Sequence, residues 1–422
     1  MNESRTNDPA SPARLARRLG VGDAVVIGLG SMIGAGVFAA FAPAASAAGA
    51  GLLPALGLAA LVAYCNATSS ARLAARYPAS GGTYVYGRER LGEVWGYLAG
   101  WGFVAGKSAS CAAMALTVGA YAWPGHENLV AVAAVVALTA LNYAGVRKAA
   151  WATRVIVAVV LAVLAVVVVA CLTSGRADLA RLEPHALEAG GVVQAAALLF
   201  FAFAGYARIA TLGEEVRDPA RTIPRAVPLA LGVTLVTYAA VAVALLAVLG
   251  PGGLARAAAP IADAVRAAGA APLAPLVTAG AAVAALGSLL ALLLGVSRTV
   301  LAMARDGHLP RVLDAVHPRT GVPHHAETAV GAAVAVVAAV AEVRGAIGFS
   351  SFGVLVYYAI ANASALTLSA AEGRPPRAIP VVGLAGCLLL AFSLPLSATL
   401  TGGAVLAAGL VVWAVRRALK RR

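Results

Sequence analysis

Charged residues are scarce in this sequence. Only 12% of its 422 residues are charged, whereas a soluble domain carries about 25%. The charge-free runs cover residues 24–71, 155–175, 226–255, 267–297, 345–371 and 378–415. A membrane-spanning helix needs about 20 predominantly apolar residues, so the first run alone has room for two spans. These runs exclude an ordinary soluble core and predict an all-α polytopic membrane protein.

Cysteine and histidine are also scarce, and neither residue type clusters. The four cysteines lie in apolar runs without disulfide or metal-site spacing, and they are expected to be small packing residues: Cys65, Cys111, Cys171 and Cys387. All six histidines fall in predicted loops. A membrane enzyme would need clustered titratable groups, so the composition argues against catalysis and predicts neither a metal nor a cofactor.

Basic residues are distributed unequally between the two sides of the membrane. Apolar windows predict twelve spans, near 22–49, 52–75, 93–122, 127–145, 152–174, 192–214, 225–249, 272–303, 325–343, 346–370, 378–395 and 398–416. Of the 32 Lys and Arg residues, 25 fall on the side of the N-terminus and 5 on the other. Positive residues are retained on the cytoplasmic side, so both termini are predicted to be cytoplasmic, in the plasma (inner) membrane. The same bias accounts for the net charge of +14 without a nucleic-acid partner.

The first predicted span is interrupted by glycine near its middle, at Gly28, Gly30, Gly34 and Gly36. Lipid cannot hydrogen-bond an interrupted backbone. The glycines therefore indicate either a cavity-lining binding site or close helix packing. The first half-helix is expected to end near Gly30 and Ser31. The second is expected to begin near Gly34, where free amides and the positive dipole end suit a carboxylate.

The sixth predicted span carries a second interruption. Ala204 and Gly205 separate an apolar half from a polar half that includes Arg208, Glu214 and Glu215. Discontinuous helices at matching positions in two halves of a chain point to the binding site of a transporter.

Three segments resemble one transporter family. They read GSMIGAGVF at 30–38, FFAFAGYARIATLGEEVRDPARTIPRA at 200–226 and MARDGHLPRVLDAVHPRTGVPHHA at 303–326. In this order they are similar to the amino acid–polyamine–organocation superfamily of permeases. The resemblance implies a LeuT-like fold, secondary transport and an amino acid or amine substrate. It divides the chain into a cytosolic tail (1–20), a first five-helix repeat (21–175), a second, inverted repeat (190–371), two additional helices (376–416) and a basic cytosolic tail (417–422).

The two interruptions together offer polar backbone groups to a zwitterion. Carbonyls at the end of the first half-helix, and those of Phe201, Ala202 and Ala204, can accept hydrogen bonds from an ammonium group. Phe203 and Tyr206 either wall or gate the pocket or pack in the core. A branched side chain at either interruption should block the substrate and leave the fold intact. The predicted substrate-binding residues are Gly30, Ser31, Met32, Ile33, Gly34, Ala35, Gly36, Phe201, Ala202, Phe203, Ala204 and Gly205.

Two cations lie within predicted spans. Lys107 comes 15 residues after Gly92, or about 22 Å along a helix, which places it beyond the midplane toward the outside. It either carries a coupled proton or is a structural lysine that caps carbonyls or reaches the outer interface. Arg208 is expected to sense a substrate carboxylate or to pair with Glu214 or Glu215. That acidic pair is alternatively a latch to an arginine after the second span: Arg72, Arg76 or Arg88.

The fifth span bears on the coupling ion. Some proton-coupled relatives carry a lysine there, at a place where sodium-coupled transporters of this fold hold an ion, but the matching position here is near Val160. Coupling to protons, with Lys107 as a substitute, is preferred to coupling to sodium. Ser288 could supply an oxygen at the family's cation place or bond back to its own helix.

The expected partners are an amino acid and the lipid bilayer. The pocket shows no acidic recognition group, which favours a neutral over a cationic amino acid. Two alternatives stay open: an amino acid or polyamine exchanger or exporter without proton coupling, and a channel or receptor-like membrane protein.

Overall fold

The computed structural model describes residues 19–420 except 78–80, 146–149, 184–187 and 211–215. In these residues the chain is helical and forms no sheet. Its extended pairing is a single parallel bridge between Leu19 and Val216. The fold class predicted from the apolar runs, an all-α polytopic membrane protein, is confirmed.

Apolar stretches separated by glycine, proline and charged residues form the helices. The structure has α1 (Val21–Met32), α2 (Ala35–Ala39), α3 (Phe41–Ala48), α4 (Leu52–Arg76), α5 (Thr83–Leu91), α6 (Glu93–Ala122), α7 (Glu127–Tyr143), α8 (Ala150–Thr173), α9 (Ala189–Phe203), α10 (Ala207–Ala210), α11 (Pro219–Arg256), α12 (Pro260–Ala267), α13 (Ala274–Arg305), α14 (His324–Val340), α15 (Val343–Leu366), α16 (Ala378–Ser393) and α17 (Leu396–Lys420). Short 3-10 helices are η1 (Gly49–Gly51), η2 (Leu179–Leu182), η3 (Ala204–Tyr206), η4 (Ala271–Leu273), η5 (Arg311–Asp314) and η6 (Ala370–Glu372).

Nine helical stretches of the described residues are long and apolar enough to cross a membrane. Three shorter apolar helices, α7, α14 and α16, lie where the remaining three spans were predicted. The first predicted span differs from the structure, because it is divided into α1, α2 and α3, and α3 continues into the stretch that includes α4. The count of twelve spans and the division into two inverted repeats stay predictions.

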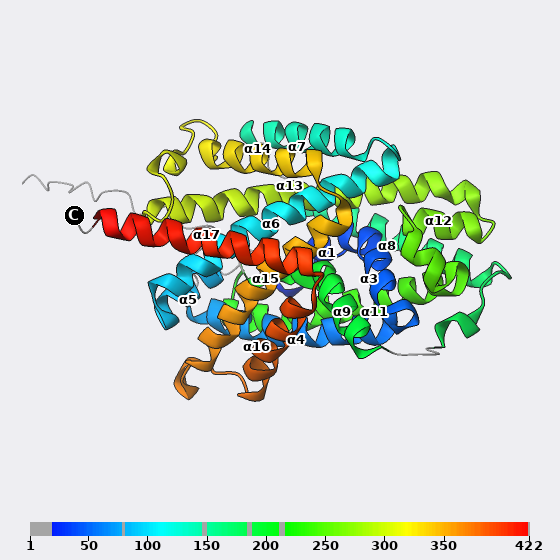
Figure 1. The fold of residues 1–422 in the computed structure, drawn as a ribbon, viewed down its shortest axis with the longest axis horizontal. Helices are drawn as coiled ribbons and strands as arrows, with labels where there is room; N and C mark the ends of the chain where they lie inside the picture. Colours follow the sequence, from blue (N-terminus) through cyan, green and yellow to red (C-terminus); the bar gives the residue numbers. More distant parts are fainter. Residues whose placement is uncertain (1–18, 78–80, 146–149, 184–187, 211–215, 421–422) are drawn as a thin grey trace, which may run out of the picture.

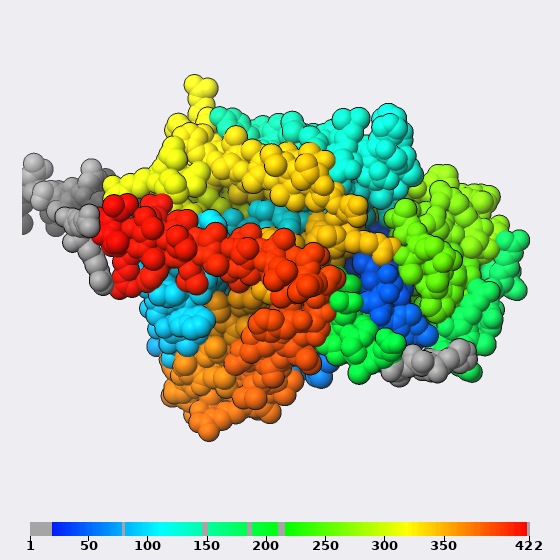
Figure 2. Space-filling view, in the orientation of Figure 1, coloured from blue at the N-terminus to red at the C-terminus, as the bar shows by residue number. Residues whose placement is uncertain are grey.

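Two long helices, α6 and α13, pack side by side through the centre, and α7 and α14 lie along one flank of this pair (Figure 1). On its other side α6 packs against α15, and α15 packs against α16. The last helix, α17, lies along the surface of the molecule (Figure 2). The interrupted helices α1–α2 and α9–α10 are enclosed by α4, α6, α11 and α13.

The outer helices expose large apolar side chains. Val236, Val340 and Phe392 are 70%, 82% and 72% exposed. In water a broad apolar surface of this kind would promote association, whereas in a bilayer it contacts the acyl chains.

Candidate substrate site

The first interruption is short and lies at Ile33 and Gly34, between α1 and α2. Gly28, Gly30 and Gly36 are helical, so of the four glycines Gly34 alone lies at the interruption, where the second half-helix was expected to begin. The first half-helix also continues to Met32, beyond the predicted end. Gly34 has a φ of −111°, and the need for glycine there comes from space, because a Cβ would lie 2.8 Å from the Cβ of Ser288.

The second interruption tightens the helix instead of opening it. Residues Ala204–Tyr206 form the 3-10 helix η3 between α9 and α10. Two of the carbonyls expected to be free have polar side chains beside them. The Tyr238 hydroxyl lies 3.1 Å from the Ala202 carbonyl. The Ala204 carbonyl accepts a hydrogen bond from the Lys107 ammonium at 3.4 Å.

The two interruptions touch each other through glycine. A Cβ on Gly205 would contact the carbonyl of Ser31 and lie 2.7 Å from the Met32 amide nitrogen. A Cβ on Gly36 would lie 2.7 Å from the Cα of Ala202. Close packing and helix interruption are therefore both present. The expectation that a branched residue at Gly205 leaves the fold intact was wrong, because the side chain would collide with main-chain atoms.

Tyr238 of α11 joins the two interruptions, and the sequence reading missed it. Its hydroxyl lies 2.6 Å from the Met32 carbonyl, to which it donates, and also 3.1 Å from the Ala202 carbonyl. The ring is fully buried and packs edge-on against Phe203, with ring centroids 5.2 Å apart. A lone tyrosine in an apolar span gives no local signal of such a contact.

A cavity of about 170 Å³ lies beside the two interruptions. Its walls include some of the predicted site residues, namely Ser31, Lys107, Phe201, Ala204, Gly205, Arg208 and Ser288. The other predicted residues do not line it and lie in the packing around it: Gly30, Met32, Ile33, Gly34, Ala35, Gly36, Ala202, Phe203 and Tyr206. Phe203 and Tyr206 are fully buried, and Tyr206 packs on Tyr358 at 5.0 Å between ring centroids. The core-packing alternative therefore describes these two aromatic residues.

One face of α6 forms a cavity wall. Phe103, Lys107, Ser110 and Met114 all line the cavity, and their spacing of three and four residues is that of a single helical face. This periodicity around Lys107 was present in the sequence and could have identified the wall. Tyr357 of α15, whose ring lies 5.0 Å from that of Phe103 between centroids, also lines the cavity and was also missed.

Lys107 is only 6% exposed, so its side chain faces the protein interior, as expected, and it does not reach the outer interface. Because its ammonium contacts the Ala204 carbonyl, it lies at the level of the helix interruptions. Lys107 lies in the middle of α6 (Glu93–Ala122), and its position relative to the membrane midplane stays a prediction. Ser288 donates to the Gly30 carbonyl at 3.0 Å, so it bridges to α1 and is not bonded back to its own helix.

Arg208 lines the cavity. Glu214 and Glu215 lie outside the described residues. Two of the three arginines considered as their partners pair with other carboxylates: Arg76 with Glu372 at 3.3 Å, and Arg88 with Asp306 at 2.6 Å and with Glu89 at 3.3 Å.

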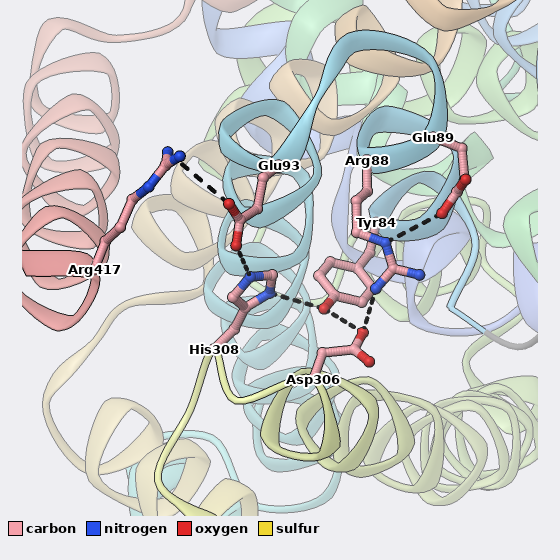
Figure 3. A network of polar contacts seen from close by, with 7 residues as sticks. All are labelled: Tyr84, Arg88, Glu89, Glu93, Asp306, His308 and Arg417. Atoms are coloured by element: carbon pink, nitrogen blue, oxygen red, sulfur yellow. Dashed lines mark hydrogen bonds and ion pairs between the residues drawn. The ribbon is translucent and has the colours of Figure 1, made fainter. Parts of the chain in front are cut away.

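A polar network fixes α5 beside one end of the cavity (Figure 3). Gly81 and Gly82 line the cavity just before α5 begins. The Tyr84 hydroxyl donates to Asp306 at 2.5 Å and lies 2.8 Å from Nδ1 of His308. Burial and the hydrogen bond with the Asp306 carboxylate raise the pKa of the Tyr84 hydroxyl, which keeps it a donor.

The same network reaches the end of the chain. Nε2 of His308 lies 3.3 Å from a Glu93 carboxylate oxygen, and Glu93 also pairs with Arg417 of α17 at 3.9 Å. Segment 306–308 belongs to the third family-like motif, so in this chain that motif joins α5, α6, α13 and α17 at one end of the bundle (Figure 3).

Comparison with known proteins places the chain in a family. The amino acid permease family model matches residues 23–408. An uncharacterised transporter of Mycobacterium tuberculosis is 71% identical over 99% of this chain and 96% of its own length. The branched-chain amino acid permease BcaP of Bacillus subtilis is 27% identical over 90% of this chain and 88% of its own. The cationic amino acid transporter 4 of Homo sapiens is 28% identical over 87% of this chain and 62% of its own. Because the match extends over almost the whole sequence, the chain belongs to the amino acid permease family, a family of membrane transporters and not of enzymes.

Proposed function

We propose that this protein is a secondary active transporter that moves an amino acid across the plasma membrane by alternating access. The substrate binds beside the interruptions of α1–α2 and α9–α10. The observation that carries the proposal is one cavity beside both interruptions, lined by Ser31 in the last turn of α1 and by Ala204 and Gly205 of the second interruption. Such convergence of discontinuous helices is typical of transporter binding sites.

The charges in the cavity favour a substrate with a free carboxylate. Lys107, Arg208 and Arg298 contribute to its walls, and no Asp or Glu among the described residues lines it. A cationic side chain would meet like charges, which is unfavourable at short range. We therefore propose a neutral amino acid in preference to a cationic one.

A second cavity supports alternating access. It has a volume of about 360 Å³ and is lined by residues that include Phe38, Tyr121 and Arg344. Between the two cavities lies a small apolar cluster of Ala35, Val118 and Ala285. The first cavity lies toward the end where α13 and α17 finish, and the second lies at the opposite end. Rearrangement of this apolar layer would expose the site to the other side.

We infer that proton movement is coupled to substrate binding because the Lys107 ammonium and the substrate ammonium compete for one carbonyl. In the structure the Lys107 ammonium occupies the Ala204 carbonyl, which is also an acceptor for a substrate ammonium. A substrate that takes this carbonyl would displace Lys107, and a buried amine without an acceptor favours its neutral form. Proton movement through Lys107 would then accompany substrate binding. The second candidate function is exchange without proton coupling, in which Lys107 is a structural residue. The long distance of 3.4 Å between the Lys107 ammonium and the Ala204 carbonyl favours this candidate, because such a contact only caps the carbonyl.

Uptake into proteoliposomes tests the function. Labelled leucine should enter saturably, be displaced by excess unlabelled leucine more than by arginine, and accumulate under an imposed proton gradient. Phe201→Ala, in the cavity wall, should raise the KM, whereas Phe392→Ala on the exposed surface should not. Counterflow without gradient-driven accumulation would indicate the exchanger. Conductance without competition would indicate a channel and contradict the proposal.

The orientation is tested by labelling. Cysteines introduced at His126 and His185 should react with a membrane-impermeant reagent in intact cells, and one at Arg311 should not. Labelling at Arg311 would place the termini outside and overturn the proposed orientation.

A further inference from the structure

Polar side chains from three helices gather behind the second interruption, outside the wall of the substrate cavity. They are Asn66 of α4, Tyr206 of η3, and Tyr358 and Asn362 of α15. Their exposed fractions are 0%, 0%, 1% and 0%. Burying a polar group costs free energy unless a hydrogen bond replaces those it made with water, and lipid offers none in exchange. These side chains therefore need hydrogen-bond partners inside the protein.

The two asparagine amides are held in one orientation. Asn362 uses both of its amide hydrogens, because Nδ2 donates to Asn66 Oδ1 at 2.6 Å and to the Tyr358 carbonyl at 3.0 Å. The thiol of Cys387 on α16 also donates to Asn66 Oδ1, at 3.3 Å. Turning either amide over would bring two nitrogens or two oxygens together. Asn66 Nδ2 therefore directs its two hydrogens elsewhere, and it has no hydrogen-bond partner among the residues that the structure describes.

Two tyrosine hydroxyls lie next to this amide and are also unsatisfied. The rings of Tyr206 and Tyr358 pack together with centroids 5.0 Å apart and planes inclined by 33°. The Tyr206 hydroxyl interacts electrostatically with the side chains of Tyr358 and Asn66. Neither hydroxyl has the distance and angle of a direct hydrogen bond to any described residue. Polar groups that are close together without direct contact are typically bridged by water.

The types of atom at this place match a water molecule better than a cation. Asn66 Nδ2 can only donate, whereas the hydroxyls of Tyr206 and Tyr358 can each donate and accept. A cation would be repelled by the amide hydrogens. A water molecule can accept from the amide and exchange hydrogen bonds with both hydroxyls, which gives the three hydrogen bonds that are typical of a buried water.

We propose that Asn66, Tyr206 and Tyr358 hold a buried water molecule behind the second interruption, and that Asn362 positions the Asn66 amide to bind it. The water joins η3 to α4 and α15. Gly205, the residue before Tyr206, lines the substrate cavity, so the water lies directly behind the cavity wall. A water molecule can rotate and exchange its partners where a packed side chain cannot, and this lets η3 shift during transport. The role in transport rests on the proposed function, whereas water binding does not.

Electron cryomicroscopy of the full-length protein in lipid nanodiscs tests water binding, at a resolution that shows ordered water. The map should contain a peak within hydrogen-bond distance of Asn66 Nδ2 and of the Tyr206 and Tyr358 hydroxyls. The peak should be lost from the map of the double variant Tyr206→Phe, Tyr358→Phe. Direct contact between the two hydroxyls without a peak would overturn the proposal. A peak that strengthens when sodium in the buffer is replaced by caesium would show a cation and would also overturn it.

Unfolding in mixed micelles gives an independent test through the sign of the effect. If each hydroxyl is bonded to water, Tyr206→Phe and Tyr358→Phe should each raise the unfolding equilibrium constant about 2- to 10-fold, the value of one hydrogen bond. If the hydroxyls are buried without a partner, their removal relieves a cost and the constant should fall. Tyr64→Phe is the matched control, because Tyr64 is 44% exposed. A fall in both variants relative to this control would overturn the proposal.

Proteoliposome exchange tests the role in transport. Tyr206→Phe should lower the maximal rate of leucine exchange severalfold and leave the KM unchanged, because the Tyr206 side chain does not line the cavity. A wild-type maximal rate in a variant whose map lacks the water would overturn the link to transport. If the wild-type protein transports no amino acid, the proposed function fails, and the map still decides whether the water is bound.

Discussion

Replacement of Tyr238 by phenylalanine should loosen the contact between the two interrupted helices. The substitution removes only a hydroxyl, which donates to the Met32 carbonyl at 2.6 Å and lies 3.1 Å from the Ala202 carbonyl. The ring that packs against Phe203 and Phe41 is kept, so no cavity is created.

The magnitude follows from the carbonyl that loses its donor. Met32 is the last residue of α1, and the final carbonyls of a helix have no intrahelical partner. A buried acceptor left without a donor costs about 1–3 kcal/mol. Phenylalanine at 238 should therefore lower the free energy of unfolding by about 1–3 kcal/mol, which corresponds to a factor of about 5–150 in the equilibrium constant.

Reversible unfolding in mixed micelles measures this difference. Tyr64→Phe is the matched control, because Tyr64 is 44% exposed and loses the same atom from the surface. The control should remain within about 0.5 kcal/mol of wild type, as is usual for surface substitutions. If Tyr238→Phe is no less stable than Tyr64→Phe, the hydroxyl does not hold the interruptions together, and the reasoning is refuted.

Further predictions concern the cavity lysine, the glycine contact and a surface ion pair. Lys107→Met should abolish proton-driven accumulation and retain substrate exchange; accumulation with an unchanged pH dependence would show that the lysine is structural. Gly205→Ala should destabilise the protein by about 1–3 kcal/mol through overpacking. The control Gly232→Ala should not, because its Cβ would meet no atom within 4 Å. Equal unfolding midpoints for the two variants would contradict the close contact at Gly205. The Arg90 guanidinium, followed by a backbone hydrogen bond, lowers the pKa of Glu372 to about 2. The ion pair should contribute fully to stability above pH 4.5, the ordinary pKa of a glutamate side chain, and this contribution should be lost as the pH falls toward 2. The difference in melting temperature between wild type and Glu372→Gln should follow that course, and a difference that is independent of pH would exclude the ion pair as its cause.

The sequence by itself determined the class of the protein and the places where helices are interrupted. Runs of about 20 apolar residues have few stable arrangements other than membrane helices, and these runs are contiguous in the chain. Glycine within the first and sixth spans marked the interruptions. An irregular backbone in lipid costs free energy at the residues where it occurs, so the signal is contained in a short segment of sequence. The lone ammonium of Lys107 was likewise expected to face inward, because lipid exposure of a charge is unfavourable.

Only the tertiary structure decided how the polar groups at these places are paired. The Ala204 carbonyl, expected to be free for a substrate, accepts a hydrogen bond from Lys107, and the Tyr238 hydroxyl lies against the Met32 and Ala202 carbonyls. Glu327 contacts Asn142 and Ser297 from two other helices. Tyr238 and Met32 are 206 positions apart. Hydrophobic length and glycine position are properties of a short segment, whereas these contacts depend on which faces of distant helices meet after packing.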